Sequence, residues 1–568
     1  MGQPSTQASN AIIYVSYGVF LVIGTGLAWR MRKQSKGEYL SGNRTQTAFP
    51  LALNFIASVA SKQQSRPNGD TDGNSRPTDG NAAPPGRREN GERLTRALGS
   101  GILFSFPELA TLAGVQGVVV YALASALPLF VFSSLGPVIR RKCPEGFVLT
   151  EWTRQRYGVI AALYLSFMTL VTLFLYMVAE LSAIGQVVNA LTGLDGLPII
   201  IVECIITTIY TSLGGFRISF LTDNIQGAMV MGLIVVATIA IGVETKIDTS
   251  LIEPSGLTKP TLLGWQLLYI LPVAILTNDF FLSNFWLRTF ASKTDRDLWL
   301  GITMAAGALL VIITLVGCTG LVAAWAGIWP GSDPENPVPG SIAFFALLEQ
   351  LPAWVVGIVL VMSVTLSTAA FDSLQSAMVS SASNDIFRNR LNVWWIRGAV
   401  VLLIIPIVVI AIQAPSILQI FLISDLISAA TIPVLVVGLS DTCYWWRGFE
   451  VVVGGLGGIL TVFIFGTIYY GSALEGAQLI LLQNGLYADD WAAFGAFVAA
   501  PFGGLLWGFG ALAVRLSVQF VMAKVKGHRF DALDRPAYFP GETGSPLEGE
   551  AELVAEPGVG GKGAGKFV

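Results

Sequence analysis

Long apolar runs alternate with short polar segments along almost the whole chain. Thirteen of these runs are about 17 to 33 residues long, and about 20 apolar residues in a helix cross the roughly 30 Å hydrocarbon core of a bilayer. The pattern therefore predicts an all-α polytopic membrane protein with about thirteen transmembrane helices. The predicted spans are 11–29, 47–113 with an interruption, 118–139, 159–191, 197–213, 224–243, 267–286, 298–325, 354–383, 393–412, 417–439, 451–470 and 491–520.

The second of these spans has the most unusual local sequence. Gly99 and Gly101 flank Ser100 in an apolar run, and Pro107 and Glu108 follow within two turns. Glycine costs about 1 kcal/mol in a helix interior and proline removes a backbone donor, so we expect this helix to be broken. Free backbone groups in a membrane are tolerated where they line a cavity, and interrupted segments of this kind mark binding sites in transporters. The alternative is a kink that serves packing alone.

A polar insert at about 59–96 interrupts the same span. It is rich in Gly, Asn, Asp, Arg and Pro, and each charge at the centre of a membrane costs at least about 2.5 kcal/mol. Joining Ser58 directly to Ala97 restores one uninterrupted span. Our hypothesis is that the insert is an unspliced intron or a gene-model error, and the alternative is a real loop that splits the helix. Sequencing of the mature transcript distinguishes the two.

The distribution of Lys and Arg predicts the orientation of the chain. A basic cluster at 30–36 follows the first span and should stay cytoplasmic, which places the N-terminus outside. The basic residues at 140–142 and 524–529 then also fall on the cytoplasmic side, and the C-terminus is cytoplasmic. The loop 327–340 contains no Lys or Arg and is expected outside. The tail 526–568 is rich in Gly, Pro and Glu and is expected to be disordered.

The composition excludes several classes of protein. The chain is 53% hydrophobic and only 12% charged, whereas about a quarter of the residues of a soluble protein are charged. The net charge of −3 gives no basic surface for a nucleic acid. One histidine and four isolated cysteines offer no metal spacing and no nucleophile-base pair, so we expect neither an enzyme nor a cofactor. The expected partners are a small-molecule solute and the lipid bilayer, with the plasma membrane as the location and the oligomeric state left open.

Seven acidic residues lie within or at the edge of apolar spans, where Lys and Arg occur only near span ends. Acids in a membrane are costly, and they usually face a cavity in which they handle cations or protons. The excess of negative groups favours a cation as the driving species. A purely structural role is an equally open alternative for each of them except Asp223 and Asp372. The seven are Glu108, Glu180, Glu203, Asp223, Asp279, Asp372 and Asp425.

Three motifs are similar to those of the sodium:solute symporter family. Residues 210–226 carry Tyr-Thr, Gly-Gly, Thr-Asp and Gln at the spacing of that family. Residues 287–293 resemble its Gln-Arg-x-Leu-Ala/Ser-Ala/Ser-Lys motif, with Leu287 in place of Gln, and residues 380–387 resemble the end of its eighth core helix. The resemblance covers about residues 11–525. It implies a LeuT-type 5+5 inverted repeat that works by alternating access.

The same resemblance implies how the chain is divided. An additional helix precedes the two inverted repeats, and two helices follow them. The expected segments are an N-terminal helix with a basic cytoplasmic loop (1–46), the first repeat with its insert (47–243), an extracellular loop (244–264), the second repeat (265–440), two C-terminal helices (441–525) and a cytoplasmic tail (526–568).

The resemblance implies a principal sodium site between core helices one and eight. Its backbone carbonyl positions fall on Ala57 and, with the insert removed, on Leu98. Its two hydroxyl positions fall on Ala369 and Ala370, which have no side-chain oxygen. The Ser-Thr pair that begins at Ser367 lies two residues earlier, about 200° round the helix. Because a hard cation needs oxygen ligands, this departure from the family weakens the expected site.

The register that places these alanines also identifies a second candidate ion site. Asp372 and Ser373 fall where some family members bind a second sodium ion, opposite Asp223 of the Thr-Asp motif. Two carboxylates in a low dielectric cannot both stay ionised unless a cation lies between them. Asp372 is therefore expected to bind the coupling ion, Na⁺ or H⁺, and the missing hydroxyl pair favours H⁺. In the alternative, Asp372 only forms hydrogen bonds with Gln375 or Ser376.

The expected solute pocket is polar and acidic. Its candidate residues are Ser100, Gly101, Glu108, Asn278 and Asp279. The sugar-contact positions of the family are apolar in this chain, whereas acids suit an amide or an amine. In general character the chain resembles the branch that carries urea and polyamines. We therefore expect a cation-coupled symporter of a small polar solute, and the alternatives are a non-transporting solute sensor, a channel or a symporter for another solute class.

Overall fold

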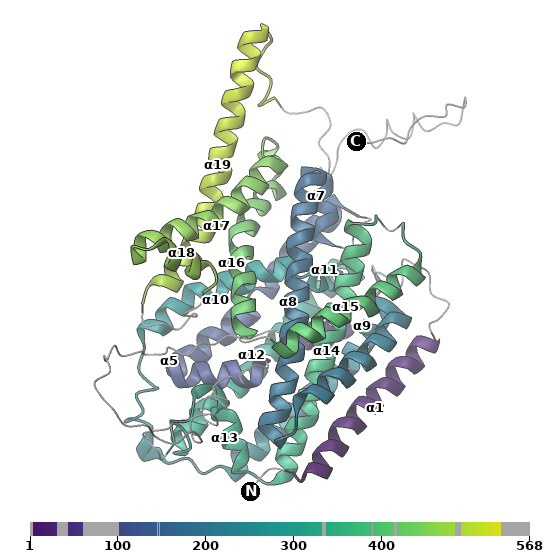
Figure 1. The fold of residues 1–568 in the computed structure, drawn as a ribbon, viewed down its shortest axis with the longest axis vertical. Coiled ribbons are helices and arrows are strands. Elements are labelled where there is room, and N and C mark those ends of the chain that lie inside the picture. Colours follow the sequence, from purple (N-terminus) through teal and green to yellow (C-terminus); the bar gives the residue numbers. More distant parts are fainter. Residues whose placement is uncertain are drawn as a thin grey trace, which may run out of the picture.

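The computed structural model describes residues 4–30, 44–60, 101–144, 146, 148–331, 337–388, 390–413, 417–482 and 490–534. Within these ranges all long elements of secondary structure are helices. The helices pack into an elongated bundle (Figure 1). The predicted all-α class is confirmed. The α-helices are α1 (Thr6–Arg30), α3 (Ala48–Ala60), α5 (Gly101–Ala126), α6 (Leu129–Lys142), α7 (Leu149–Tyr157), α8 (Val159–Thr192), α9 (Gly196–Glu244), α10 (Leu262–Phe281), α11 (Ser283–Ala291), α12 (Asp295–Trp325), α13 (Ala343–Glu349), α14 (Ala353–Asp385), α15 (Val393–Gln413), α16 (Ile417–Val436), α17 (Gly448–Tyr470), α18 (Ala473–Ile480) and α19 (Ala492–Lys526).

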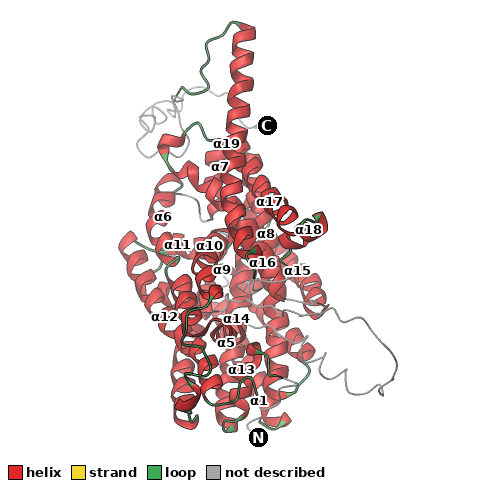
Figure 2. Ribbon diagram, turned by 90° about the vertical axis from the view of Figure 1, so that its left-hand side faces the viewer, coloured by secondary structure: helices red, strands yellow, loops and turns green. Residues whose placement is uncertain are grey.

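Eleven helical segments in the described ranges are long and apolar enough to cross a bilayer, and they correspond to eleven of the thirteen predicted spans. One of the other two is the second span, of which residues 61–100 lie outside the described residues. The insert at 59–96 accordingly stays a hypothesis. The other is 417–439, where Ile423–Leu439 is a shorter apolar helix. The described chain begins at one end of the bundle and α19 leaves it at the other (Figure 2).

Two glycines bend long helices. Gly215, with φ of 62°, separates the two spans that were predicted within α9. Gly114, with φ of 60°, bends α5 and turns the backbone N–H of Val115 toward the Leu257 carbonyl, to which it donates over 2.9 Å. A Cβ at Gly114 would lie 1.9 Å from the same carbonyl oxygen, so only glycine fits there. In contrast, α5 stays helical through Pro107, and the break expected around Ser100 lies outside the described residues.

The seventh predicted span, 267–286, is two helices and not one. α10 ends and α11 begins on either side of Leu282, whose backbone is extended with φ of −79° and ψ of 102°. The prediction of one continuous span is therefore wrong. No glycine or proline occurs at the bend, and all nine residues of α11 are buried. We infer that packing of α11 in the bundle, and not local helix propensity, stabilises the bend.

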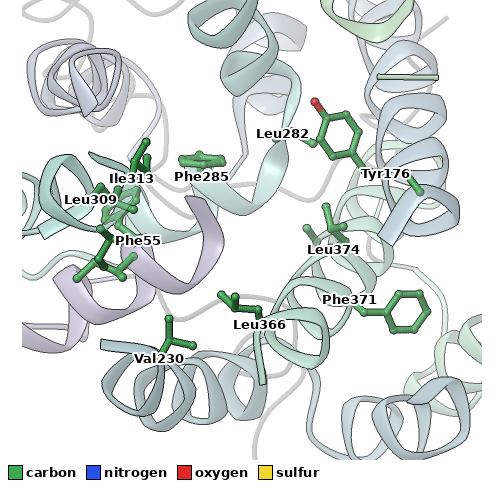
Figure 3. Packing of buried hydrophobic residues seen from close by; sticks show 14 of the residues in the cluster. Phe55, Tyr176, Val230, Leu282, Phe285, Leu309, Ile313, Leu366, Phe371 and Leu374 are labelled. Carbon is green, nitrogen blue, oxygen red and sulfur yellow. The ribbon is translucent and has the colours of Figure 1, made fainter. Parts of the chain in front are cut away.

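The helix α14 forms the centre of the bundle. A larger share of it is buried than of any other candidate span, and it packs against α1, α3, α8 and α9. Phe371 and Leu374 of α14 belong to the same apolar core as Phe55 of α3 and Phe285 of α11 (Figure 3). The helix α12 in turn packs against α3 and α5. Polar side chains on α14 are thus held among helices and away from the lipid-facing surface.

Candidate functional site

Asp372 is a fully buried carboxyl in the C-terminal half of α14. Thr211 and Thr222 of α9 each donate a hydrogen bond to it over 2.8 Å, one to each oxygen, and Ser376 lies at 3.5 Å. Gln375 donates instead to Thr208, so the main partners of Asp372 lie on another helix. A carboxylate with several hydroxyl oxygens around it can ligate Na⁺ or accept a proton.

Asp223 is held by a buried arginine. One guanidinium nitrogen of Arg288 donates to Asp223 Oδ2 over 2.6 Å, and Ser373 donates to the same oxygen over 2.8 Å. The side chains of Arg288 and Asp223 are 1% and 0% exposed. Arg288 follows the predicted span 267–286 directly, so it agrees with the expectation that Lys and Arg occur only near span ends. The sequence did not indicate that its side chain is buried against Asp223. Since Arg288 balances the charge of Asp223, Asp372 is left as the uncompensated acid of the pair.

The residues expected for the principal sodium site are only partly described. Ala57 lies in α3, which packs against α14, whereas Leu98 lies outside the described residues. Ala369 and Ala370 are buried in α14. Ser367, two residues earlier, donates its hydroxyl to a glutamate of α9 and not toward α3. The described part of this region thus places Ala57 in a helix that packs against α14, and it has no side-chain hydroxyl at the expected positions of α14.

Asn278 joins three helices at the bend between α10 and α11. Its amide donates to the Tyr176 hydroxyl of α8 and to the Asp425 carboxyl of α16, and its backbone carbonyl accepts from the N–H of Leu282 over 3.2 Å. Figure 3 shows the Tyr176 hydroxyl directed toward the bend at Leu282. We call Tyr176, Asn278 and Asp425 the bend cluster. It combines an amide, a phenol and a carboxyl inside the membrane-spanning part of the bundle.

The other candidate pocket residues lie on neighbouring helices. Asp279 follows Asn278 on α10, and Glu108 lies on α5, which packs against α10; both acids are buried. Gly101 is the first residue of α5, and Ser100 lies outside the described residues.

The bend cluster contains two residues that the expected pocket lacked. Asp425 was already recognisable as an acid within an apolar span, so the signal for it was present. Tyr176 has no comparable signal, because a tyrosine in an apolar helix is usually a packing residue.

Comparison with known proteins agrees with the motifs. The model of the Sodium:solute symporter family matches residues 95–450. The chain is 49% identical to the "Spermidine transporter" of Candida albicans over 539 residues, which are 94% of this chain and 95% of that protein. It is also 24% identical to the "Probable urea active transporter 1" of Schizosaccharomyces pombe. That match extends over 259 residues, which are 43% of this chain and 34% of that protein.

Two solved structures share the fold at low sequence identity. A Na⁺-coupled sialic acid symporter has a TM-score of 0.67 at 14% identity, over 89% of this chain and 97% of the symporter. A nucleobase-cation-symport-1 family transporter has a TM-score of 0.51 at 12% identity, over 90% of this chain and 98% of the transporter. These likenesses confirm the expected LeuT-type fold.

Proposed function

Because the chain belongs to the sodium:solute symporter family, we propose that it is a proton-coupled importer of polyamines such as spermidine at the plasma membrane. In more general terms, the chain is a cation-coupled symporter of a polyamine or urea. The choice of a polyamine is supported by the extent of the likeness. The relative named as a spermidine transporter matches nearly the whole chain, whereas the relatives named as urea transporters match less than half of it.

The observation that carries the polyamine proposal is the bend cluster. A polyamine ammonium group is a charged hydrogen-bond donor, and carboxylate and phenol oxygens accept from it in charge-assisted hydrogen bonds. The ring of Tyr176 adds a face that attracts a cation. Urea is neutral and can only donate hydrogen bonds to Asp425, so it gains less from this charge than an ammonium group does. We propose that further pocket residues surround the same solute, namely Ser100, Gly101, Glu108 and Asp279.

We assign proton coupling to Asp372, with Ser373 and Asp223 beside it. Arg288 balances the charge of Asp223, so a single proton on Asp372 neutralises the group. Thr211 lies before the bend at Gly215 and Thr222 after it, so Asp372 joins α14 to both halves of α9.

Protonation turns one acceptor oxygen of Asp372 into a donor and changes these hydrogen bonds. Occupancy of the site can thereby favour one arrangement of the helices over another, as alternating access requires.

Sodium coupling is the second candidate. The carbonyls at Ala57 and Leu98 would supply two of its ligands, as in the family. Ala369 and Ala370 supply no side-chain oxygen, and a sodium ion there would need further oxygens from water or from Asp372. We favour the proton for this reason.

Transport in proteoliposomes tests the proposal. Purified protein is supplied with radiolabelled spermidine or urea, while proton and sodium gradients are imposed separately. We expect saturable accumulation of spermidine driven by the proton gradient. Accumulation of urea alone, or dependence on sodium alone, would contradict the proposed solute or ion. Binding without flux would identify a sensor, and current that does not saturate would identify a channel.

A further inference from the structure

A second acidic cluster lies outside the site described above. It consists of Glu180 of α8, Glu203 of α9, Tyr17 of α1 and Ser367 of α14. Glu203 is fully buried, and both of its oxygens accept a hydrogen bond: Tyr17 donates to Oε2 over 2.8 Å and Ser367 donates to Oε1 over 2.8 Å. An environment that donates to both oxygens favours the ionised form of a carboxyl. Glu203 is therefore arranged to be the negative member of the cluster.

Glu180 faces the same serine and the same carboxyl. It is 6% exposed, and its charge interacts with that of Glu203. Ser367 has one hydroxyl proton, which is directed to Glu203. Glu180 also interacts with Ser367, but one hydroxyl proton cannot be donated to both carboxyls at once. Two adjacent carboxyls inside the bundle cannot both be ionised unless a positive charge is added.

The neighbouring helices add no positive charge to this pair. The titratable groups that face it are Tyr17 of α1 and Cys204 and Tyr210 of α9, and no Lys or Arg of the described chain acts on either glutamate. Tyr210 interacts electrostatically both with Glu203 and with Asp372. Its buried hydroxyl lies beside the Asp372 carboxyl without making a hydrogen bond of good geometry. The two acidic sites are therefore neighbours, with Tyr210 acting on both.

We propose that Glu180 and Glu203 share one exchangeable proton and form a second proton-binding site apart from Asp372. Tyr17 and Ser367 donate hydrogen bonds to Glu203 and keep it ionised. Glu180, the more exposed of the two glutamates, takes up and releases the proton. The additional helix α1 thereby contributes directly to the site through Tyr17.

Glu180 also lies next to the proposed solute pocket. It follows Tyr176 of the bend cluster by four residues, about one turn of α8, so the two side chains point to nearly the same face of the helix. A role of the site in transport rests on the proposed function. Its binding of a proton does not.

Infrared difference spectroscopy tests proton binding without any solute. Spectra of purified protein at acidic and alkaline pH are subtracted, and protonated carboxyl bands are compared between variants. We expect a band in the native protein that is absent in Glu180→Gln and present in Glu253→Gln, which changes an exposed loop carboxyl. Glu203→Gln removes the negative neighbour and is expected to move the Glu180 band out of the same pH window. A band that is unchanged in Glu180→Gln and in Glu203→Gln and disappears entirely in Asp372→Asn would overturn the proposal.

Proteoliposomes with a trapped pH dye test the role in transport. We expect fewer protons per spermidine in Glu180→Gln, while exchange of labelled for unlabelled spermidine without a gradient persists and shows that the variant is folded. Tyr17→Phe keeps the ring and removes one donor to Glu203. We expect it to alter the infrared band and to change the ratio of protons to spermidine in the same direction as Glu180→Gln. An unchanged ratio together with an unchanged band refutes the second proton site. Absence of spermidine transport in the native protein refutes the proposed function instead and leaves the infrared result to decide on proton binding.

Discussion

Arg288 of α11 donates a hydrogen bond to Asp223 of α9 over 2.6 Å, and both side chains are buried. The pair connects the short helix after the bend at Leu282 to the helix that carries Thr211 and Thr222. Ser373 of α14 touches both partners, since it donates to Asp223 and accepts from Arg288 over 2.9 Å. One ion pair thus joins three helices around Asp372.

Removing one partner of this pair should destabilise the protein more than removing both. Arg288→Gln leaves the Asp223 carboxylate buried without its cation, which typically costs about 3–5 kcal/mol. The double variant Arg288→Gln with Asp223→Asn removes both charges and should recover part of that loss. Thermal unfolding in detergent compares the stability of the native protein, of Arg288→Gln and of the double variant. A double variant as unstable as Arg288→Gln would show that the charges are not what holds these helices.

Replacing the proposed coupling carboxyl should separate accumulation from exchange. Asp372→Asn keeps the shape of the side chain and still hydrogen-bonds to Thr211 or Thr222, but it cannot bind and release a proton. We expect it to abolish accumulation of spermidine against a gradient and to retain exchange. Ser376→Ala, at the longest of the contacts, is the matched control and should accumulate normally. Accumulation at the native ratio by Asp372→Asn would remove Asp372 from the coupling role.

The bend cluster should discriminate between charged and neutral solutes. Asp425→Asn removes a charge-assisted hydrogen bond, worth about 1.5–3 kcal/mol, and should raise the KM for spermidine by about 10- to 150-fold. Any binding of urea should change far less, because urea has no charge.

The control for that experiment is Asp248→Asn in the exposed loop after α9. Hydrogen bonds from the hydroxyl and backbone of Ser250 lower the pKa of Asp248, so this residue tests the loss of a surface carboxylate. Equal increases in KM for Asp425→Asn and Asp248→Asn would contradict a specific contact at the bend.

A close contact outside the site allows a test of the packing itself. The Tyr157 hydroxyl donates to the Leu435 carbonyl over 2.6 Å, and a Cβ at Gly438 would lie 1.9 Å from that hydroxyl. Burial raises the pKa of Tyr157, so its phenol remains a neutral donor.

Two single variants and their combination measure this contact. Gly438→Ala should destabilise by about 1–3 kcal/mol through overpacking, and Tyr157→Phe by about 1 kcal/mol through the lost hydrogen bond. In the Tyr157→Phe background, Gly438→Ala should cost less, because the clashing oxygen is gone. Strict additivity of the two losses in thermal unfolding would show that the two side chains do not meet.

The sequence by itself determined the features that depend on local composition. A run of apolar residues must leave water wherever it packs, so eleven of the predicted spans correspond to membrane-length helices. The glycines at 214–215 marked the division within α9, and the rarity of acids in a membrane marked Asp372 and Asp425 as special. The family motifs likewise consist of neighbouring residues and could be recognised one by one.

Only the tertiary structure decided which distant side chains meet. Arg288 is 65 residues from Asp223, and Tyr17 is 186 residues from Glu203. Hydropathy fixes how long a helix is but not how it is rotated about its axis, and that rotation selects the partner of every polar group. The bend at Leu282 has no glycine or proline to announce it, because contacts along all sides of α11 stabilise it. The same packing chose Arg288 as the cation for Asp223 and left Asp372 for the ion.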